Sequence, residues 1–196
     1  MKRNLYKKLI LLIVCLGLVL GGCGAPSENN SSGSSESPAG ILSSFSTTTL
    51  TGDSVDQTIL EGYDLTMVNV WATYCGPCVT EMPYISNLIE DYEEQGVQIL
   101  GLVSDVMTSQ GELDPYQVSL AEDVVEKTGA GNYTHLMADL SLYGLLSQIY
   151  AVPTTFFVDS EGNQVGSAYV QMLTEDQFRS VIDETLADFR ANDGEV

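Results

Sequence analysis

From residue 41 onward, short apolar runs alternate with segments whose apolar residues recur every three or four positions. The first pattern is typical of buried strands and the second of amphipathic helices, so the chain predicts both in alternation. The predicted strands are 45–50, 65–72, 97–103, 133–139, 154–159 and 164–170. The predicted helices run from Cys75 to about Gly96 and over 118–128, 142–150 and 175–189.

The order of these segments predicts the fold class. Strands separated by helices come first, and a hairpin with a turn at 160–163 and a closing helix capped by Thr174 follow. This order predicts an α/β sandwich with a mixed sheet, without identifying the fold. Pro83 falls inside the first helix and predicts a kink there.

The first 40 residues have a different pattern, typical of an export signal and a linker. Four basic residues among the first eight precede an almost wholly apolar stretch over 9–20, as in a secretory signal peptide. This stretch is short for a membrane span. It leads into Leu20-Gly21-Gly22-Cys23, which resembles the lipobox of bacterial lipoproteins. The resemblance implies cleavage before Cys23 and acylation of Cys23, and the alternative is an ordinary secreted protein.

Residues 24–40 are Ser, Gly, Asn, Pro, Glu and Ala with no large apolar side chain, so they predict a flexible linker. We therefore divide the chain into a signal peptide over 1–22, a lipidated cysteine and linker over 23–40, and one domain over 41–196. The predicted location is the extracytoplasmic face of a cell membrane, held there by the lipid anchor.

Removing the signal peptide makes the chain strongly acidic. Three basic residues then stand against 27 acidic ones, a formal charge of −24. Such a surface repels nucleic acid and anionic lipid headgroups and favours solubility or basic partners. We therefore expect no nucleic-acid partner.

The cysteines indicate redox chemistry. Cys15 lies in the signal peptide and Cys23 is consumed by lipid, which leaves Cys75 and Cys78 as the thiols of the domain. Two cysteines supply half of a four-ligand zinc site, and His135 adds one ligand at most, so we predict no metal. The pair is left to react with itself and with cysteines of other proteins. Its disulfide is the redox carrier, and no other cofactor is expected.

Three separated motifs carry a family resemblance: Trp71-Ala72-Thr73-Tyr74-Cys75-Gly76-Pro77-Cys78, then Glu81-Met82-Pro83, and later Val152-Pro153-Thr154. They resemble the thioredoxin superfamily. With the lipobox, they resemble its TlpA/ResA branch of membrane-tethered thiol-disulfide oxidoreductases. The resemblance covers roughly residue 45 to the C-terminus. It implies a thioredoxin-like sandwich with a central mixed sheet flanked by helices, an N-terminal strand extension and a C-terminal hairpin plus helix.

The spacing of the pair assigns each cysteine a role. Cys75 at the start of a helix faces unpaired backbone N–H groups and the positive end of the helix dipole, which favour a thiolate. We expect it to be the nucleophile. Cys78 returns to the same face one turn later, shielded by that turn, and is the expected resolving cysteine. Gly76 and Pro77 form the turn with little bulk around Cys75.

The resemblance implies that the peptide bond before Pro153 is cis and that its loop lies against the cysteine pair. Val152 then has a free backbone edge on which an extended client segment can dock. A trans proline that starts a strand is the commoner alternative in proteins at large. We expect four residues to contact clients: Val152 and Thr154 in this loop, and Gly76 and Pro77 in the turn between the cysteines. Trp71 and Tyr74 are expected to shape the same surface, although a plain packing role for Trp71 is the alternative.

Glu81 is the residue most particular to the branch. It lies three positions after Cys78, where a partly buried carboxylate can accept or return the proton of that thiol. The alternative is a first-turn glutamate favoured by the helix dipole. Asn69 stands where many thioredoxins carry a buried aspartate. Since asparagine accepts no proton, Glu81 or water must accept the proton of the Cys78 thiol.

These residues predict a thiol-disulfide oxidoreductase that reduces disulfides of exported proteins. The resemblance implies a membrane thiol carrier as electron donor, and clients such as apocytochrome c or a methionine sulfoxide reductase. One alternative is a thiol peroxidase, since residues 69–76 have some likeness to the glutathione-peroxidase active-site strand. Position 72 is alanine, and the Pro-x-x-x-Thr-x-x-Cys motif of peroxiredoxins is missing. A non-catalytic surface binding module is the other alternative.

Overall fold

The structure is a computed structural model that describes residues 40–193. The predicted signal peptide, the lipidation site Cys23 and nearly all of the predicted linker lie outside the described residues. Within 40–193, no helix has both the length and the apolar character needed to cross a bilayer.

A five-stranded mixed sheet with the order β5-β4-β3-β6-β7 forms the centre of the domain. Strands β3, β4 and β5 are parallel, whereas β6 runs antiparallel to β3 and β7 runs antiparallel to β6. The strands are β3 (Leu65–Trp71), β4 (Val97–Val103), β5 (Thr134–Met137), β6 (Thr154–Val158) and β7 (Gln164–Tyr169).

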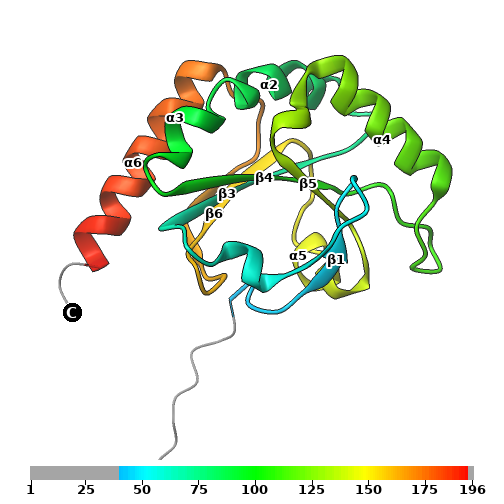
Figure 1. Cartoon of the computed structure of the whole chain (residues 1–196), viewed down its shortest axis with the longest axis horizontal. Helices are drawn as coiled ribbons and strands as arrows, with labels where there is room; N and C mark the ends of the chain where they lie inside the picture. The colour runs from blue at the N-terminus through cyan, green and yellow to red at the C-terminus, as the bar shows by residue number, and fades with distance from the viewer. Residues whose placement is uncertain (1–39, 194–196) are drawn as a thin grey trace, which may run out of the picture. The chain divides into compact units, whose positions relative to one another are not determined.

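Helices cover both faces of this sheet (Figure 1). On one face lie α2 (Gly76–Ser86), α3 (Ile89–Glu93), α4 (Pro115–Thr128) and α6 (Glu175–Asp193). On the other face lie α5 (Tyr143–Leu146) and the hairpin of β1 (Ser46–Thr48) and β2 (Ser54–Asp56). Three short 3-10 helices complete the domain, namely η1 (Gln57–Leu60), η2 (Ala130–Asn132) and η3 (Leu140–Leu142).

Strand β3 is buried along its whole length and separates two cores. Leu65, Met67 and Trp71 belong to the core beneath α2 and α6, whereas Val68 and Val70 belong to the core on the other face. The side chains of a strand alternate between its two faces, so Asn69 points toward α2 together with Met67 and Trp71. One polar side chain therefore lies in the middle of an apolar row.

The sheet and its layers confirm the thioredoxin-like α/β sandwich that the sequence predicts, including the N-terminal strands and the C-terminal hairpin and helix. Gly129 ends α4 and adopts φ 70° in the left-handed region, as glycine commonly does at a helix C-terminus. Helix α4 begins at Pro115, three residues before the predicted start, because the side chain of Asp114 accepts hydrogen bonds from two N–H groups of its first turn.

Two predicted helices differ from the structure. The helix expected from Cys75 to Gly96 is two helices, with a break at Asn87 and Leu88, and Pro83 lies inside the first of them. There the Leu88 N–H donates to the carbonyl of Ile85, three residues back, and this tighter turn ends α2. The helix expected over 142–150 is the shorter pair η3 and α5.

Candidate active site

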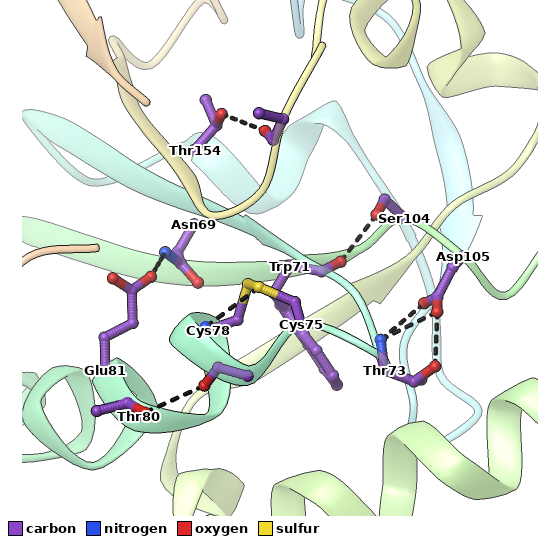
Figure 2. Close-up of a disulfide and its surroundings, with 12 residues drawn as sticks. Asn69, Trp71, Thr73, Cys75, Cys78, Thr80, Glu81, Ser104, Asp105 and Thr154 are labelled. Atoms are coloured by element: carbon purple, nitrogen blue, oxygen red, sulfur yellow. Dashed lines mark hydrogen bonds between the residues drawn. A yellow bond between two sulfur atoms is a disulfide. The ribbon is translucent and has the colours of Figure 1, made fainter. Parts of the chain in front are cut away.

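A disulfide joins Cys75 and Cys78 at the N-terminus of α2 (Figure 2). Strand β3 ends at Trp71, and the chain turns through the next four residues, with the Cys75 N–H donating to the Ala72 carbonyl at 3.0 Å. Cys75 is the N-cap of α2, and its Cα lies 5.3 Å from that of Cys78, which is the usual separation for a disulfide.

The two sulfurs have different surroundings. Cys75 is 5% exposed and Cys78 is 0% exposed, while Gly76 and Pro77 between them lie on the surface. The Cys78 N–H donates to Sγ of Cys75 at 3.2 Å, so an amide of the first helical turn, which has no carbonyl partner within the helix, faces that sulfur. The same amide and the positive end of the helix can stabilise a thiolate on Cys75 after reduction.

A carboxylate fixes the turn that leads to Cys75. Asp105 follows β4 and accepts the Thr73 N–H at 3.0 Å and the Thr73 hydroxyl at 2.6 Å. Ser104 donates to the Trp71 carbonyl at 2.9 Å through its side chain and again through its N–H. These contacts tie the segment before Cys75 to the end of the neighbouring strand (Figure 2).

Glu81 is fully buried one helical turn beyond Cys78. Its Oε1 accepts from the Asn69 side-chain amide at 2.7 Å, and its Oε2 accepts from the Leu173 N–H at 3.0 Å. Burial raises the pKa of Glu81 to about 7, and the two hydrogen bonds partly offset that rise because they favour the carboxylate. A group with this pKa can take up and release a proton near neutral pH.

The loop before β6 contains the predicted cis bond between Val152 and Pro153, which confirms that prediction. Val152 lines a groove of about 220 Å³. The groove also contains Tyr74, beside Cys75, and Tyr150, which are 77% and 83% exposed. The structure thus brings Tyr74 and Val152 together, although 78 positions of sequence separate them.

Trp71 and Thr154 are too deeply buried to belong to a surface that contacts clients. Trp71 is 0% exposed because β3 places it in the core, where its Nε1–H donates to Nδ1 of His135 at 3.2 Å. The packing alternative therefore describes Trp71. Thr154 is 2% exposed, and its hydroxyl donates to the Ala151 carbonyl within the same loop. The predicted client contacts of Trp71 and Thr154 are therefore wrong, and both residues pack in the interior near the site.

His135 lies in β5, and both of its ring nitrogens are hydrogen-bonded. Its Nε2 bonds the Ala130 carbonyl at 2.9 Å, and its Nδ1 accepts from Trp71, so the hydrogen is on Nε2. Burial lowers the pKa of His135 to about 4, which keeps the ring neutral at physiological pH.

Residues 40–164 match the AhpC/TSA family. The thiol-disulfide oxidoreductase ResA of a Bacillus cereus strain is 32% identical to this chain over 170 residues, which cover 84% of this chain and 88% of that protein. The chain belongs to the AhpC/TSA family, and it is a ResA-like thiol-disulfide oxidoreductase. The ResA of Bacillus subtilis is 24% identical over 175 residues, 84% of either chain.

Solved structures share the fold of this oxidoreductase. A thiol:disulfide interchange protein of the thioredoxin family from Chlorobium tepidum aligns with a TM-score of 0.60 at 22% identity, covering 77% of this chain and 99% of that one. StoA from Bacillus subtilis aligns with a TM-score of 0.53 at 17% identity, covering 73% and 98%. These similarities confirm the thioredoxin-like fold, and the ResA relatives make the chain an enzyme rather than a binding module.

Sequence reasoning misses the residues that hold Glu81. It treats Asn69 only as a poor proton acceptor, and it assigns no part to Thr155 or to the backbone of Leu173. One signal is present, since Asn69 is the single amide in a strand whose other residues, apart from Thr66, are apolar. Leu173 gives no such signal, because a backbone N–H donor leaves no mark on the sequence.

Proposed function

We propose that this oxidoreductase reduces disulfides of exported client proteins at the extracytoplasmic face of a membrane, where a lipid on Cys23 anchors it. The observation that carries the proposal is the asymmetry of the cysteine pair. Cys75 reaches the surface next to Tyr74, which lines the groove, whereas Cys78 is buried on the same helix as Glu81. This arrangement suits a nucleophile that meets clients and a resolving thiol that does not.

The first half of the cycle joins enzyme and client. The Cys75 thiolate attacks one sulfur of the client disulfide and forms a mixed disulfide. The other client sulfur leaves with the electron pair of the broken bond and takes a proton from solvent. The Cys78 N–H and the helix dipole favour the attacking thiolate.

The second half releases the client. The Cys78 thiol gives its proton to the Glu81 carboxylate, and its sulfur attacks Sγ of Cys75. The Cys75–Cys78 disulfide forms, and the second client sulfur leaves as a thiolate. The client has then gained two electrons. Two electrons and two protons from a membrane thiol carrier return the pair to its dithiol state.

Client docking uses the surface around Cys75. Gly76 and Pro77 are exposed beside Cys75, and Tyr74 and Val152 line one groove. An extended client segment can pair with the backbone at Val152 while its neighbouring side chains contact Tyr74. The buried Pro153 and Thr154 hold that loop. Clients of the expected kind are apocytochrome c, through its haem-binding cysteines, and an exported methionine sulfoxide reductase.

The direction of electron flow is tested by the reduction potential of the pair together with insulin reduction. We expect a potential nearer the thioredoxin value of about −270 mV than the DsbA value of about −120 mV. We also expect reduction of insulin disulfides that Cys75→Ser and Cys78→Ser each abolish. In cells, Cys78→Ser should trap clients as mixed disulfides through Cys75. A potential at the oxidising end, or insulin left oxidised by the reduced wild-type protein, would contradict the reductase function.

A thiol peroxidase is the second candidate, and the likeness of residues 69–76 to a peroxidase strand is what favours it. The reduced protein would then consume peroxide far faster than free thiol does. We expect no such acceleration, since Ala72 lacks the hydroxyl that the corresponding peroxiredoxin threonine provides.

A further inference from the structure

The amide of Asn69 occupies an unusual position in the core. Asn69 is 0% exposed and points from the centre of β3 toward α2. Its Nδ2 donates both hydrogens, one to Oε1 of Glu81 at 2.7 Å and one to the Thr155 hydroxyl at 3.1 Å. The donor capacity of the side chain is therefore fully used.

The acceptor capacity of Asn69 is not used in this oxidised state. Among the residues that the structure describes, Oδ1 of Asn69 has no hydrogen-bond partner although it is buried. A buried acceptor without a partner costs about 1–3 kcal/mol and calls for a functional or structural explanation. Turning the amide over does not relieve this cost while Glu81 is ionised, because the carbonyl would then face a carboxylate oxygen.

The unpartnered oxygen of Asn69 is turned away from Glu81, because Nδ2 of the same amide bonds that carboxylate. Figure 2 shows Oδ1 of Asn69 pointing toward the side on which the Cys75–Cys78 disulfide lies, with Glu81 on the opposite side of the amide. Cys78 is the buried member of the pair. In the disulfide its sulfur carries no hydrogen, and reduction adds one. Reduction thus creates a buried S–H donor on the side of the amide toward which the buried acceptor points.

We propose that Asn69 is the positioning residue of the resolving step. Its amide nitrogen holds the Glu81 carboxylate ready to receive a proton, and its carbonyl oxygen accepts a hydrogen bond from the Cys78 thiol once the disulfide is reduced. The proposal rests on the proposed function, because it assigns a part to Asn69 within the same resolving step. The hydrogen bond between Asn69 and Glu81 is present in the oxidised protein. The hydrogen bond from the Cys78 thiol to Asn69 forms when the disulfide is reduced.

The role follows from which protonation state each contact favours. A hydrogen bond to the neutral thiol keeps Cys78 protonated in the resting dithiol, so that Cys75 alone is the thiolate. During resolution the proton leaves Cys78 for the Glu81 carboxylate. The electron pair on the Cys78 sulfur forms the bond to Cys75, and the client sulfur departs with the pair of the mixed disulfide. Asn69 exchanges no proton or electron.

The test compares Asn69→Ala with Thr155→Val, which removes the other contact of the same amide group and leaves Glu81 in place. The full chain with Cys15→Ser and Cys23→Ser is used, so that Cys75 and Cys78 are its only thiols. The reduced protein reacts with an aromatic disulfide reagent at Cys75, and stopped-flow absorbance follows release of the second aromatic thiolate between pH 5 and 9.

We expect the acid limb of the wild-type profile to move up by about one pH unit in Asn69→Ala, since a charge-assisted hydrogen bond to the carboxylate is lost. Because the pKa of Glu81 is about 7, this shift should lower the rate at pH 7 by about fivefold. Thr155→Val should stay within about twofold of wild type, as a neutral contact is lost. Glu81→Gln should remove the acid limb. Identical profiles for Asn69→Ala and wild type, or an acid limb that survives Glu81→Gln, would overturn the proposal.

A spectroscopic measurement covers the case in which Asn69→Ala does not fold. In the same background carrying Cys75→Ser, Cys78 is the only S–H group, and its infrared stretching band should lie at lower frequency than in the further variants Asn69→Leu and Asn69→Val, whose side chains carry no acceptor. A band at the same frequency in all of them would contradict the contact to Oδ1. Failure of the wild-type protein to release the second thiolate would count against the proposed function itself rather than against Asn69.

Discussion

Thr73 shows how a single residue fixes the position of the nucleophile. Two positions before Cys75, it donates its N–H and its hydroxyl to Asp105, which lies at the end of the next strand. Hydrogen bonds to a charged acceptor contribute about 1.5–3 kcal/mol. The turn that presents Cys75 is therefore held by a carboxylate from an element remote in sequence, and not by the Cys-x-x-Cys motif alone.

The first prediction concerns Asp105→Ala. We expect it to lower the free energy of unfolding by about 1.5–3 kcal/mol and to slow insulin reduction, because the Thr73 N–H loses its acceptor. Thr73→Val removes the hydroxyl alone and should cost less. Urea denaturation at pH 7 and an insulin assay measure both effects.

Asp114→Ala is the matched control for Asp105→Ala. Asp114 caps α4 and its loss should cost about 1 kcal/mol without changing the rate of insulin reduction. If Asp105→Ala and Asp114→Ala lose equal stability and both keep full activity, Asp105 has no special part in holding the turn.

At the scale of elements, the three parallel strands leave room for the side chain of one histidine, His135, because the middle strand carries a glycine beside it. Gly101 of β4 lies in register between Asn69 of β3 and His135 of β5. A Cβ added at Gly101 would collide with the imidazole of His135. Glycine in β4 therefore lets the ring lie across its neighbour and accept the hydrogen bond from Trp71.

The second prediction is that Gly101→Ala destabilises the protein by about 1–3 kcal/mol, as overpacking in a core does. The displaced ring of His135 should lose its contact to Trp71, which is the only tryptophan in the chain, so tryptophan fluorescence reports the change directly. Gly144→Ala in α5 is the control, because an added Cβ meets no atom there. Gly101→Ala with unchanged fluorescence and stability would show that β4 shifts at little cost.

Elements with a clear period were predictable from sequence, and contacts between distant elements were not. The strand over 97–103 was predicted with the bounds that β4 has, since a short buried apolar run has few alternatives. The end of α2 was not, because a change from i−4 to i−3 hydrogen bonds depends on how α3 packs. The motif located both cysteines, Glu81 and the proline loop. The hydrogen bond from Leu173 to Glu81 spans 92 positions, and only the folded chain shows it.

For the molecule as a whole, two buried groups make stability depend on pH in opposite directions. The pKa of Glu81 is raised from 4.5 to about 7, so the folded state binds a proton that the unfolded state has lost between these values. The stability from protonated Glu81 is complete below pH 4.5 and is lost as the pH rises through 7. The pKa of His135 is lowered from 6.5 to about 4, so its contribution is complete above pH 6.5 and is lost as the pH falls toward 4.

The third prediction separates these two contributions by their opposite signs. Urea denaturation of the oxidised protein between pH 4.5 and 7.5 gives the free energy of unfolding of wild type, Glu81→Gln and His135→Gln. Relative to Glu81→Gln, wild type should become less stable as the pH rises, by up to about 3 kcal/mol. Relative to His135→Gln, it should become more stable over the same range by a similar amount. Glutamine retains a donor and an acceptor at either position, so the comparison removes the titration while keeping hydrogen-bonding capacity. A flat difference curve, or one with the opposite slope, would mean that the buried group replaced in that variant does not titrate as its surroundings require.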